Sequence, residues 1–181
     1  MSSVKPPPKR SEPPITAAQL REVGLFGALS DDFLEHLVST LAVVRFMPGE
    51  AIFREGDPAR EFYVVLDGEL EVLKRSRRGR ETRVAILGPS DCIGEMSIID
   101  MQPRSATVRA LGPARMLRIT TEEMDALYRH DLKSYTLIIL NIARDLSRRL
   151  RVTDGLLADF TANVLEEYVQ TPASKRPGEA Q

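Results

Sequence analysis

Hydrophobic residues follow one period at the two ends of the chain and another in the middle. From Ile15 to Leu41 the apolar residues recur three and four positions apart, which is typical of amphipathic helices. Thr16 and Ser30 stand where a polar residue caps a helix N-terminus. The pattern therefore predicts two short helices in this first segment.

The middle of the chain is rich in glycine and in short runs of β-branched and aromatic residues. Seven of the eleven glycines lie between Gly49 and Gly112, and they separate β-rich runs at 62–66, 70–73, 84–87 and 106–110. Turn residues at this spacing are typical of an all-β sandwich or barrel.

A helical pattern returns after Ile119. The sequence Thr-Thr-Glu-Glu from Thr120 supplies a cap and an acidic first turn for a helix near 121–129, and a long helix is predicted from Lys133 to about Val169. The fold class is therefore predicted to be α+β, with a β-barrel and N-terminal helices over 15–132 and a long helix over 133–170.

Both ends of the chain have a composition that opposes folding. Residues 1–14 hold five of the twelve prolines, and residues 171–181 are also rich in small and polar residues. Such segments bury too little apolar surface to offset the entropy lost on ordering. We expect a disordered arm at 1–14 and a disordered tail at 171–181.

Charge and cysteine content narrow the classes of function. Twenty-five basic and twenty-six acidic residues leave a net charge of -1, which provides no overall attraction to nucleic acid or anionic lipid. Cys92 is the only cysteine, so an internal disulfide and a multi-cysteine zinc site are excluded. No apolar run approaches the ~20 residues of a membrane span. We expect a cytoplasmic protein that makes no contact with a membrane.

The residues from Asp91 to Ala110 suggest a binding site for a phosphate. Gly94 lacks a Cβ, so a ligand can approach the backbone, and the sequence after it can start a short helix whose N–H groups face an anion. Arg104, at the start of the next β-run, has a planar fork that suits two phosphate oxygens.

Glu95 adds a second chemical requirement to this site. A carboxylate beside a phosphate is repelled unless it accepts a hydrogen bond, and acidic residues of dinucleotide-binding folds do this for a ribose 2′-hydroxyl. A phosphate next to a ribose hydroxyl is the chemistry of a nucleotide. A plain turn at Gly94 and a structural Glu95–Arg104 ion pair are the alternative interpretation.

These motifs resemble those of the cyclic-nucleotide-binding domains, which include the bacterial catabolite activator and the regulatory subunits of cAMP-dependent kinase. The resemblance rests on Ile-Gly-Glu-Met-Ser-Ile-Ile at 93–99, Pro-Arg-Ser-Ala-Thr-Val at 103–108, and further matches at 23–30, 48–57 and 62–72. It implies an eight-stranded jelly-roll barrel with helices at both ends. It also implies that Glu95 holds the ribose hydroxyl, that Arg104 and Ser105 hold the cyclic phosphate, and that Gly94, Met96 and Ser97 contribute backbone.

The long helix carries a second resemblance. Residues 145–154 are similar to the dimer helix of the catabolite activator group, in which a Val-Thr-Ser sequence touches the base. Thr153 matches the threonine, but Asp154 replaces the serine. This departure leaves base selectivity open, and cAMP is expected over cGMP on the resemblance and on Thr153.

The same helix shows the spacing of a coiled coil. Apolar positions alternate at intervals of four and three, and the set is Ile139, Ala143, Leu146, Leu150, Thr153, Leu157, Phe160 and Val164. A stripe this narrow predicts a parallel homodimer. Thr153 is its only hydroxyl, and a buried hydroxyl without a partner is costly, so we expect a bound base to satisfy it and to tighten the dimer.

Three functions are compatible with these observations. The first is a stand-alone cyclic-nucleotide receptor that signals through an unknown output protein, because the residues after Gln170 leave no room for a helix-turn-helix domain. The second is a ligand-free structural dimer of the same fold. The third is a nucleic-acid-associated protein that uses the basic stretch 74–83, predicted to be a charged hairpin tip around Gly79.

The other residues that could bind a metal or take part in catalysis give weaker evidence for a function. His36 and His130 are far apart in sequence and lack neighbours at metal-ligand spacing, so neither metal binding nor acid–base catalysis is expected of them. Cys92 is expected to be a packed small residue. No motif of an enzyme is present in the sequence.

Overall fold

The computed structural model describes the backbone of residues 15–170 and the side chains of residues 15–164. The predicted arm at 1–14 and tail at 171–181 lie outside the described residues. The chain divides between Asn141 and Ile142 into two compact units. The first contains the β-sheets, and the second consists of the later part of the long helix.

The N-terminal helices are α1 (Ala17–Arg21) and α2 (Asp31–Thr40), with a 3-10 turn, η1 (Gly24–Phe26), between them. Thr16 caps α1, because Gln19 N donates to Thr16 Oγ1 at 3.2 Å and Gln19 Oε1 accepts from Thr16 N at 2.9 Å. Ser30 caps α2 by accepting from Phe33 N at 3.4 Å. Both predicted N-caps are confirmed.

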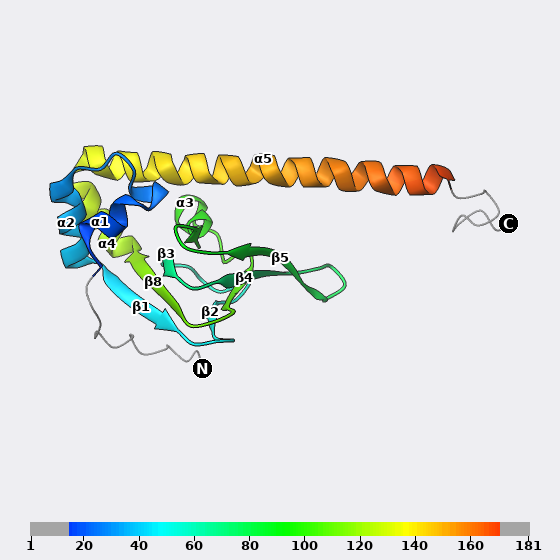
Figure 1. The fold of residues 1–181 in the computed structure, drawn as a ribbon, viewed down its shortest axis with the longest axis horizontal. Coiled ribbons are helices and arrows are strands. Elements are labelled where there is room, and N and C mark those ends of the chain that lie inside the picture. The colour runs from blue at the N-terminus through cyan, green and yellow to red at the C-terminus, as the bar shows by residue number, and fades with distance from the viewer. Residues whose placement is uncertain (1–14, 171–181) are drawn as a thin grey trace. The chain divides into compact units, whose positions relative to one another are not determined.

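Eight strands follow, and they form two four-stranded antiparallel sheets (Figure 1). Their bounds are β1 Ala42–Phe46, β2 Ala51–Phe53, β3 Glu61–Asp67, β4 Leu70–Arg75, β5 Glu81–Leu87, β6 Cys92–Ile93, β7 Thr107–Ala110 and β8 Ala114–Thr120. One sheet has the order β1-β8-β3-β6 and the other β2-β7-β4-β5. The eight-stranded jelly roll implied by the sequence resemblance is confirmed.

The core of the barrel is made by inward-facing apolar side chains of both sheets. Val65, Leu70 and Met116 are completely buried, and the wider cluster adds Val44, Phe46, Tyr63, Ile93, Val108, Ala110 and Ala114. Burying one such large side chain contributes about 1.5–3 kcal/mol. Cys92 is also buried on β6, as expected of a packed small residue.

The basic stretch forms the tip of the β4–β5 hairpin. Ser76 N donates to Arg80 O at 2.8 Å across the turn, and Gly79 has a φ of +78° that glycine adopts readily. Because β5 is paired only with β4, it is the edge strand of its sheet. The predicted hairpin with a charged, exposed tip is confirmed.

Two helices follow the barrel. Helix α4 (Thr121–His130) begins with a capping box, in which Glu123 N donates to Thr120 Oγ1 at 3.1 Å and Thr120 N donates to Glu123 Oε2 at 2.7 Å. Helix α5 (Leu132–Gln170) has 39 residues. Asn141 Nδ2 ties its first part to the N-terminal helices by donating to Leu25 O at 3.0 Å and to Gly27 O at 3.1 Å.

Helix α5 starts one residue earlier than the sequence predicted, and its long uninterrupted course agrees with the prediction. Within residues 15–170, no helix is both long enough and apolar enough to cross a membrane.

Candidate functional site

The segment around Gly94 is a tight turn between a strand and a short helix. β6 ends at Ile93, Gly94 has a φ of +81°, and α3 (Met96–Asp100) follows with Glu95 as its N-cap residue. A φ in this region is adopted at low cost only by glycine. The short helix expected after Gly94 is therefore confirmed.

Glu95 and Arg104 are both buried, which is unusual for charged side chains. Their exposed fractions are 3% and 4%. The sequence placed Arg104 at the start of a strand, but β7 begins only at Thr107 and Arg104 lies in the loop before it. The loop is held in place because Arg104 N donates to Asp57 O at 2.9 Å and Arg104 O accepts from Gly56 N at 2.9 Å.

The Arg104 guanidinium is oriented by three contacts. Nη1 donates to Gly94 O at 3.0 Å, and Nη2 donates to Glu61 O at 2.6 Å. The guanidinium carbon also lies 4.1 Å from the centre of the Phe53 ring, in a cation–π arrangement. These contacts fix the orientation of the Arg104 guanidinium.

Gly94 has a structural role in addition to the one expected from the sequence. The sequence argument gave it the task of leaving room for a ligand. In the structure a Cβ at this position would clash with Arg104 Nη1 and would lie 3.3 Å from a Phe53 ring carbon. The absence of a side chain at Gly94 thus allows the arginine itself to approach the backbone.

Burial and nearby charges act on Arg104 in opposite directions. Burial lowers its pKa, because desolvation disfavours the charged form. The Coulombic interactions with Tyr63, Glu61, Asp57 and Glu95 oppose this lowering. The guanidinium therefore sits in a low-dielectric setting, where a further anion interacts with it strongly.

One nitrogen atom of the Arg104 guanidinium has no partner among the described residues. This atom is the buried Nε. Leaving a buried donor unsatisfied costs about 1–3 kcal/mol, and more for a charged group. An anion bound beside Arg104 would satisfy this donor.

The other predicted residues of this segment lie on α3 and in the loop after it, and we refer to residues 94–105 as the cassette. Ser97 is buried on α3, and the Ser105 hydroxyl contacts Met96 Sδ at 3.9 Å. The carbonyl of Ser105 accepts from Lys74 Nζ, which also pairs with Glu55 Oε1 at 2.8 Å. The end of the cassette is therefore tied to strand β4.

Thr153 lies on α5, in the second compact unit. Its hydroxyl donates to Arg149 O, one turn earlier, at 2.9 Å. The sequence argument treated this hydroxyl as lacking a partner until a base bound, and that premise is wrong. A helical threonine satisfies its own donor by bonding back to the i−4 carbonyl.

Phe53 and Glu61 belong to the site but were not predicted. Phe53 supplies the ring beneath Arg104, and Glu61 supplies a carbonyl oxygen. Glu61 lies 43 positions before Arg104, and its contribution is a backbone atom that any residue carries. No spacing in the sequence indicates such a contact.

The two histidines, which showed no relation in sequence, are brought together. The rings of His36 on α2 and His130 on α4 stack with centroids 4.1 Å apart and planes 17° apart. Burial lowers the pKa of His36, and the nearby His130 lowers it further. No group of three histidine, cysteine, aspartate or glutamate side chains suited to a metal ion occurs within residues 15–170.

Comparison with known proteins identifies the class. Residues 43–131 match the family model described as the cyclic nucleotide-binding domain. This span runs from β1 through α4 and contains the whole Gly94–Arg104 segment. The chain belongs to the cyclic nucleotide-binding domain family.

Individual relatives agree with this assignment. The chain is 33% identical over 141 residues to the CRP-like cAMP-activated global transcriptional regulator of Mycobacterium tuberculosis, a match that covers 78% of this chain and 61% of the regulator. The chain thus spans less than two thirds of that curated relative.

Solved structures match over more of their length. The N-terminal domain of a transcriptional regulator from Streptomyces coelicolor is 33% identical with a TM-score of 0.64, covering 72% of this chain and 94% of that one. A cyclic nucleotide-binding domain from Methylobacillus flagellatus is 25% identical with a TM-score of 0.74, covering 79% of this chain and 83% of that one.

Proposed function

We propose that this chain is a receptor for a cyclic mononucleotide and that the Gly94–Ser105 segment binds it. The observation that carries the proposal is the buried Arg104, fixed by two hydrogen bonds yet left with an unsatisfied Nε. In this assignment Arg104 pairs with the cyclic phosphate and Glu95 accepts a hydrogen bond from the ribose 2′-hydroxyl. Gly94, Met96 and Ser97 contribute backbone, and Ser105 adds a phosphate contact.

A barrel that serves only as a scaffold fits these observations less well. A scaffold gains nothing from burying both a carboxylate and a guanidinium, because desolvating charges costs more than well-packed apolar side chains in the same space. The bonds of Arg104 to Gly94 O and Glu61 O orient the guanidinium but leave its buried Nε without a partner. A site prepared for an anion explains this arrangement.

The choice of nucleotide is proposed to be cAMP in preference to cGMP. Support comes from the relatives, since the Mycobacterium tuberculosis protein is described as cAMP-activated and a Thermus thermophilus protein that is 32% identical is described as a cyclic AMP receptor protein. Thr153 remains a proposed base contact, which would require its hydroxyl to turn from Arg149 O or to accept while it donates.

The long helix is proposed to form a parallel homodimer, through which occupancy reaches an output protein. The large apolar side chains exposed in the predicted seam are Leu150 and Leu157 at 61%, Phe160 at 66% and Val164 at 46%. Burying these side chains against a second copy supplies the apolar contact that a coiled coil needs.

A role in nucleic-acid binding has one observation in its favour. The hairpin tip carries Arg75, Arg77, Arg78 and Arg80 in exposed positions. Phosphate contacts by such a cluster make affinity fall steeply with salt. The tip contains no aromatic side chain for base stacking, which favours the receptor interpretation.

Titration calorimetry with cAMP and cGMP tests the proposal directly. We expect binding of cAMP at micromolar concentration or tighter, with a weaker response to cGMP. Absence of heat from both nucleotides, with the folded state verified by circular dichroism, would favour the scaffold. Salt-dependent retention of DNA without nucleotide binding would favour the hairpin function.

A further inference from the structure

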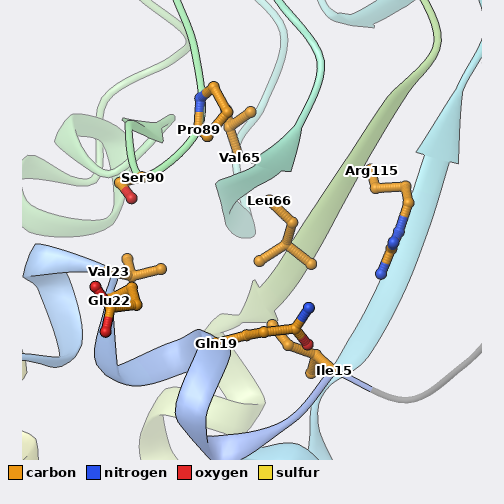
Figure 2. A pocket seen from close by; sticks show the side chains of 9 residues that line it. All are labelled: Ile15, Gln19, Glu22, Val23, Val65, Leu66, Pro89, Ser90 and Arg115. Carbon is orange, nitrogen blue, oxygen red and sulfur yellow. The ribbon is translucent and has the colours of Figure 1, made fainter.

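A pocket lies on the first unit, between helix α1 and the barrel (Figure 2). It encloses about 250 Å³ and is lined by Ile15, Gln19, Glu22, Val23, Val65, Leu66, Pro89, Ser90 and Arg115. None of these residues belongs to the Gly94–Ser105 segment. The volume is below the ~300–1,000 Å³ typical of drug-sized ligands and equals roughly eight water molecules, so it suits a small organic molecule.

Two unused hydrogen-bond donors lie on one side of this pocket. Among the described residues, the buried Nε of Arg115 has no hydrogen-bond partner. Gln19 uses its Oε1 to accept from Thr16 N at 2.9 Å, which leaves its Nε2 amide group as a donor. Figure 2 shows the Arg115 guanidinium extending toward the Gln19 amide. A carboxylate placed between them would accept from both groups.

The charges around Arg115 also favour an anion. Arg115 is directly opposite Arg45 on β1 and opposite Asp67 on β3. Like charges facing each other across strands are destabilising. Within residues 15–170, Arg115 forms no ion pair with Asp67 or any other carboxylate. An added carboxylate would supply the missing counter-charge.

The rest of the lining defines the body of the ligand. Val23, Leu66 and Pro89 present hydrocarbon to the pocket, whereas the Val65 side chain belongs to the barrel core. Glu22 lies across the pocket from Arg115 in Figure 2 and would repel a second negative group. A ligand with a single carboxylate and a short aliphatic chain therefore matches the lining.

The backbone at Ser90 supports a role in binding. Ser90 has a φ of +74°, a conformation that costs a non-glycine residue roughly 1–3 kcal/mol and that clusters at ligand clamps. Its backbone N–H donates to Val65 O at 2.9 Å. This bond fixes Ser90 in the wall of the pocket.

We propose that this pocket binds a small aliphatic monocarboxylate, with the carboxylate on Arg115 and Gln19 and the hydrocarbon against Val23 and Leu66. A simple fatty acid and an aliphatic amino acid share this chemistry. Isovalerate and leucine represent the two sources, and in the amino acid Glu22 additionally pairs with the ammonium group.

The test is a titration of the full chain with sodium isovalerate and with leucine, observed through the NMR signals of the Val23 and Leu66 methyl groups. At least one of the two should cause saturable shifts, and glutarate, a dicarboxylate, should not. Leucine binding that is weakened by Glu22→Gln shows that the pocket takes the amino acid. Tighter binding of isovalerate than of leucine shows that it takes the simple fatty acid.

Two variants test the carboxylate contact. Arg115→Gln should weaken binding at least about tenfold, since a charge-assisted hydrogen bond is lost. Gln19→Glu can keep the capping box of α1 but replaces the amide donor with a carboxylate, so it should abolish binding. Arg129→Gln, which alters an exposed arginine paired with Asp125 on α4, is the control and should leave the titration unchanged.

Three results would overturn the proposal. The first is no saturable shift with either monocarboxylate at concentrations of tens of millimolar, and the second is unchanged binding in both variants. The third is inorganic phosphate binding more tightly than isovalerate. Because the pocket shares no residue with the Gly94–Ser105 segment, calorimetry with cAMP reports on the proposed receptor function separately.

Discussion

Single residues of the candidate site depend on one another through close packing. The carbonyl of Gly94 accepts from Arg104 at 3.0 Å, and the same glycine must lack a side chain for the arginine to fit. Glu95, the next residue, is buried and contributes a Coulombic attraction to Arg104. The chemistry of the site and its local folding are therefore coupled at these three positions.

Replacing Arg104 tests the phosphate assignment. Arg104→Ala removes a charge-assisted contact to phosphate, and we expect nucleotide affinity to fall by about 2–4 kcal/mol, or roughly 30- to 1,000-fold. Glu95→Gln should cost less, because the amide oxygen still accepts from a hydroxyl. Calorimetry measures both, with Arg129→Ala as a surface control. An unchanged dissociation constant in Arg104→Ala would refute the assignment.

Gly94 permits a second test, with a control in the same chain. Gly94→Ala adds a methyl group that clashes with Arg104 at a φ of +81°, whereas Gly79→Ala adds one in open space at a φ of +78°. The unfavourable backbone conformation costs about 1–2 kcal/mol in both variants. We expect Gly94→Ala to lower the free energy of unfolding in urea by more than Gly79→Ala does. Equal losses would contradict the clash.

The stacked histidines predict a dependence of stability on pH. The pKa of His36 in the folded state is lowered below its ordinary value of 6.5, so the unfolded chain binds the proton more readily. This contribution favours folding above about pH 6.5 and is lost as the pH falls through the lower, folded-state pKa. His36→Gln should reduce the difference in urea midpoint between pH 7.5 and 5.5. An identical difference in wild type and variant would contradict this.

At the scale of elements, apolar side chains are exposed along the later part of α5, within the residues that the structure describes. Leu150 and Leu157 are each 61% exposed, and Phe160 is 66% exposed. Val152 and Leu156 are similarly exposed but lie outside the predicted seam. The exposed apolar surface is therefore wider than the narrow seam on which the prediction of a homodimer rested.

The double variant Leu150→Glu/Leu157→Glu tests this pairing. Two carboxylates in the seam should oppose association, so sedimentation equilibrium should show a monomer where the wild type is a dimer. Nucleotide affinity should fall as well if dimer and site are coupled. A wild type that sediments as a monomer at micromolar concentrations, with and without nucleotide, would contradict the prediction.

Thr153 provides a finer test on the same helix. Because its hydroxyl already donates to Arg149 O, Thr153→Ala should leave the oligomeric state unchanged. A modest loss of cAMP affinity, about 0.5–1.5 kcal/mol for one neutral hydrogen bond, is expected if the hydroxyl contacts the base. Calorimetry with the variant decides this, and Thr161→Ala, with the same type of bond to Leu157 O, is its control.

At the scale of the whole molecule, the proposed preference for cAMP is not decided by the barrel alone. The cassette contains a serine, Ser105, that can bond to phosphate or to a guanine amino group, so the barrel alone leaves the choice of base open. We expect cAMP to bind more tightly than cGMP in direct competition. Binding of cGMP more than tenfold tighter would refute the preference while leaving the receptor function intact.

The sequence by itself determined the features that depend on neighbours along the chain. Helical and strand periods, the caps at Thr16, Ser30 and Thr120, and the glycine turn of the β4–β5 hairpin agree with the structure. The order of motifs also identified the family and its barrel. These features are local because periodicity, capping and turn conformation each involve residues only a few positions apart.

Only the tertiary structure decided which distant groups meet. The Phe53 ring, the Glu61 carbonyl and the Gly94 carbonyl converge on Arg104 from three different segments. His36 and His130 stack although 94 positions separate them, and Gln19 and Arg115 line one pocket. Such contacts depend on how the sheets and helices pack, and two of the three groups around Arg104 are backbone atoms common to every residue. No local pattern in the sequence records them.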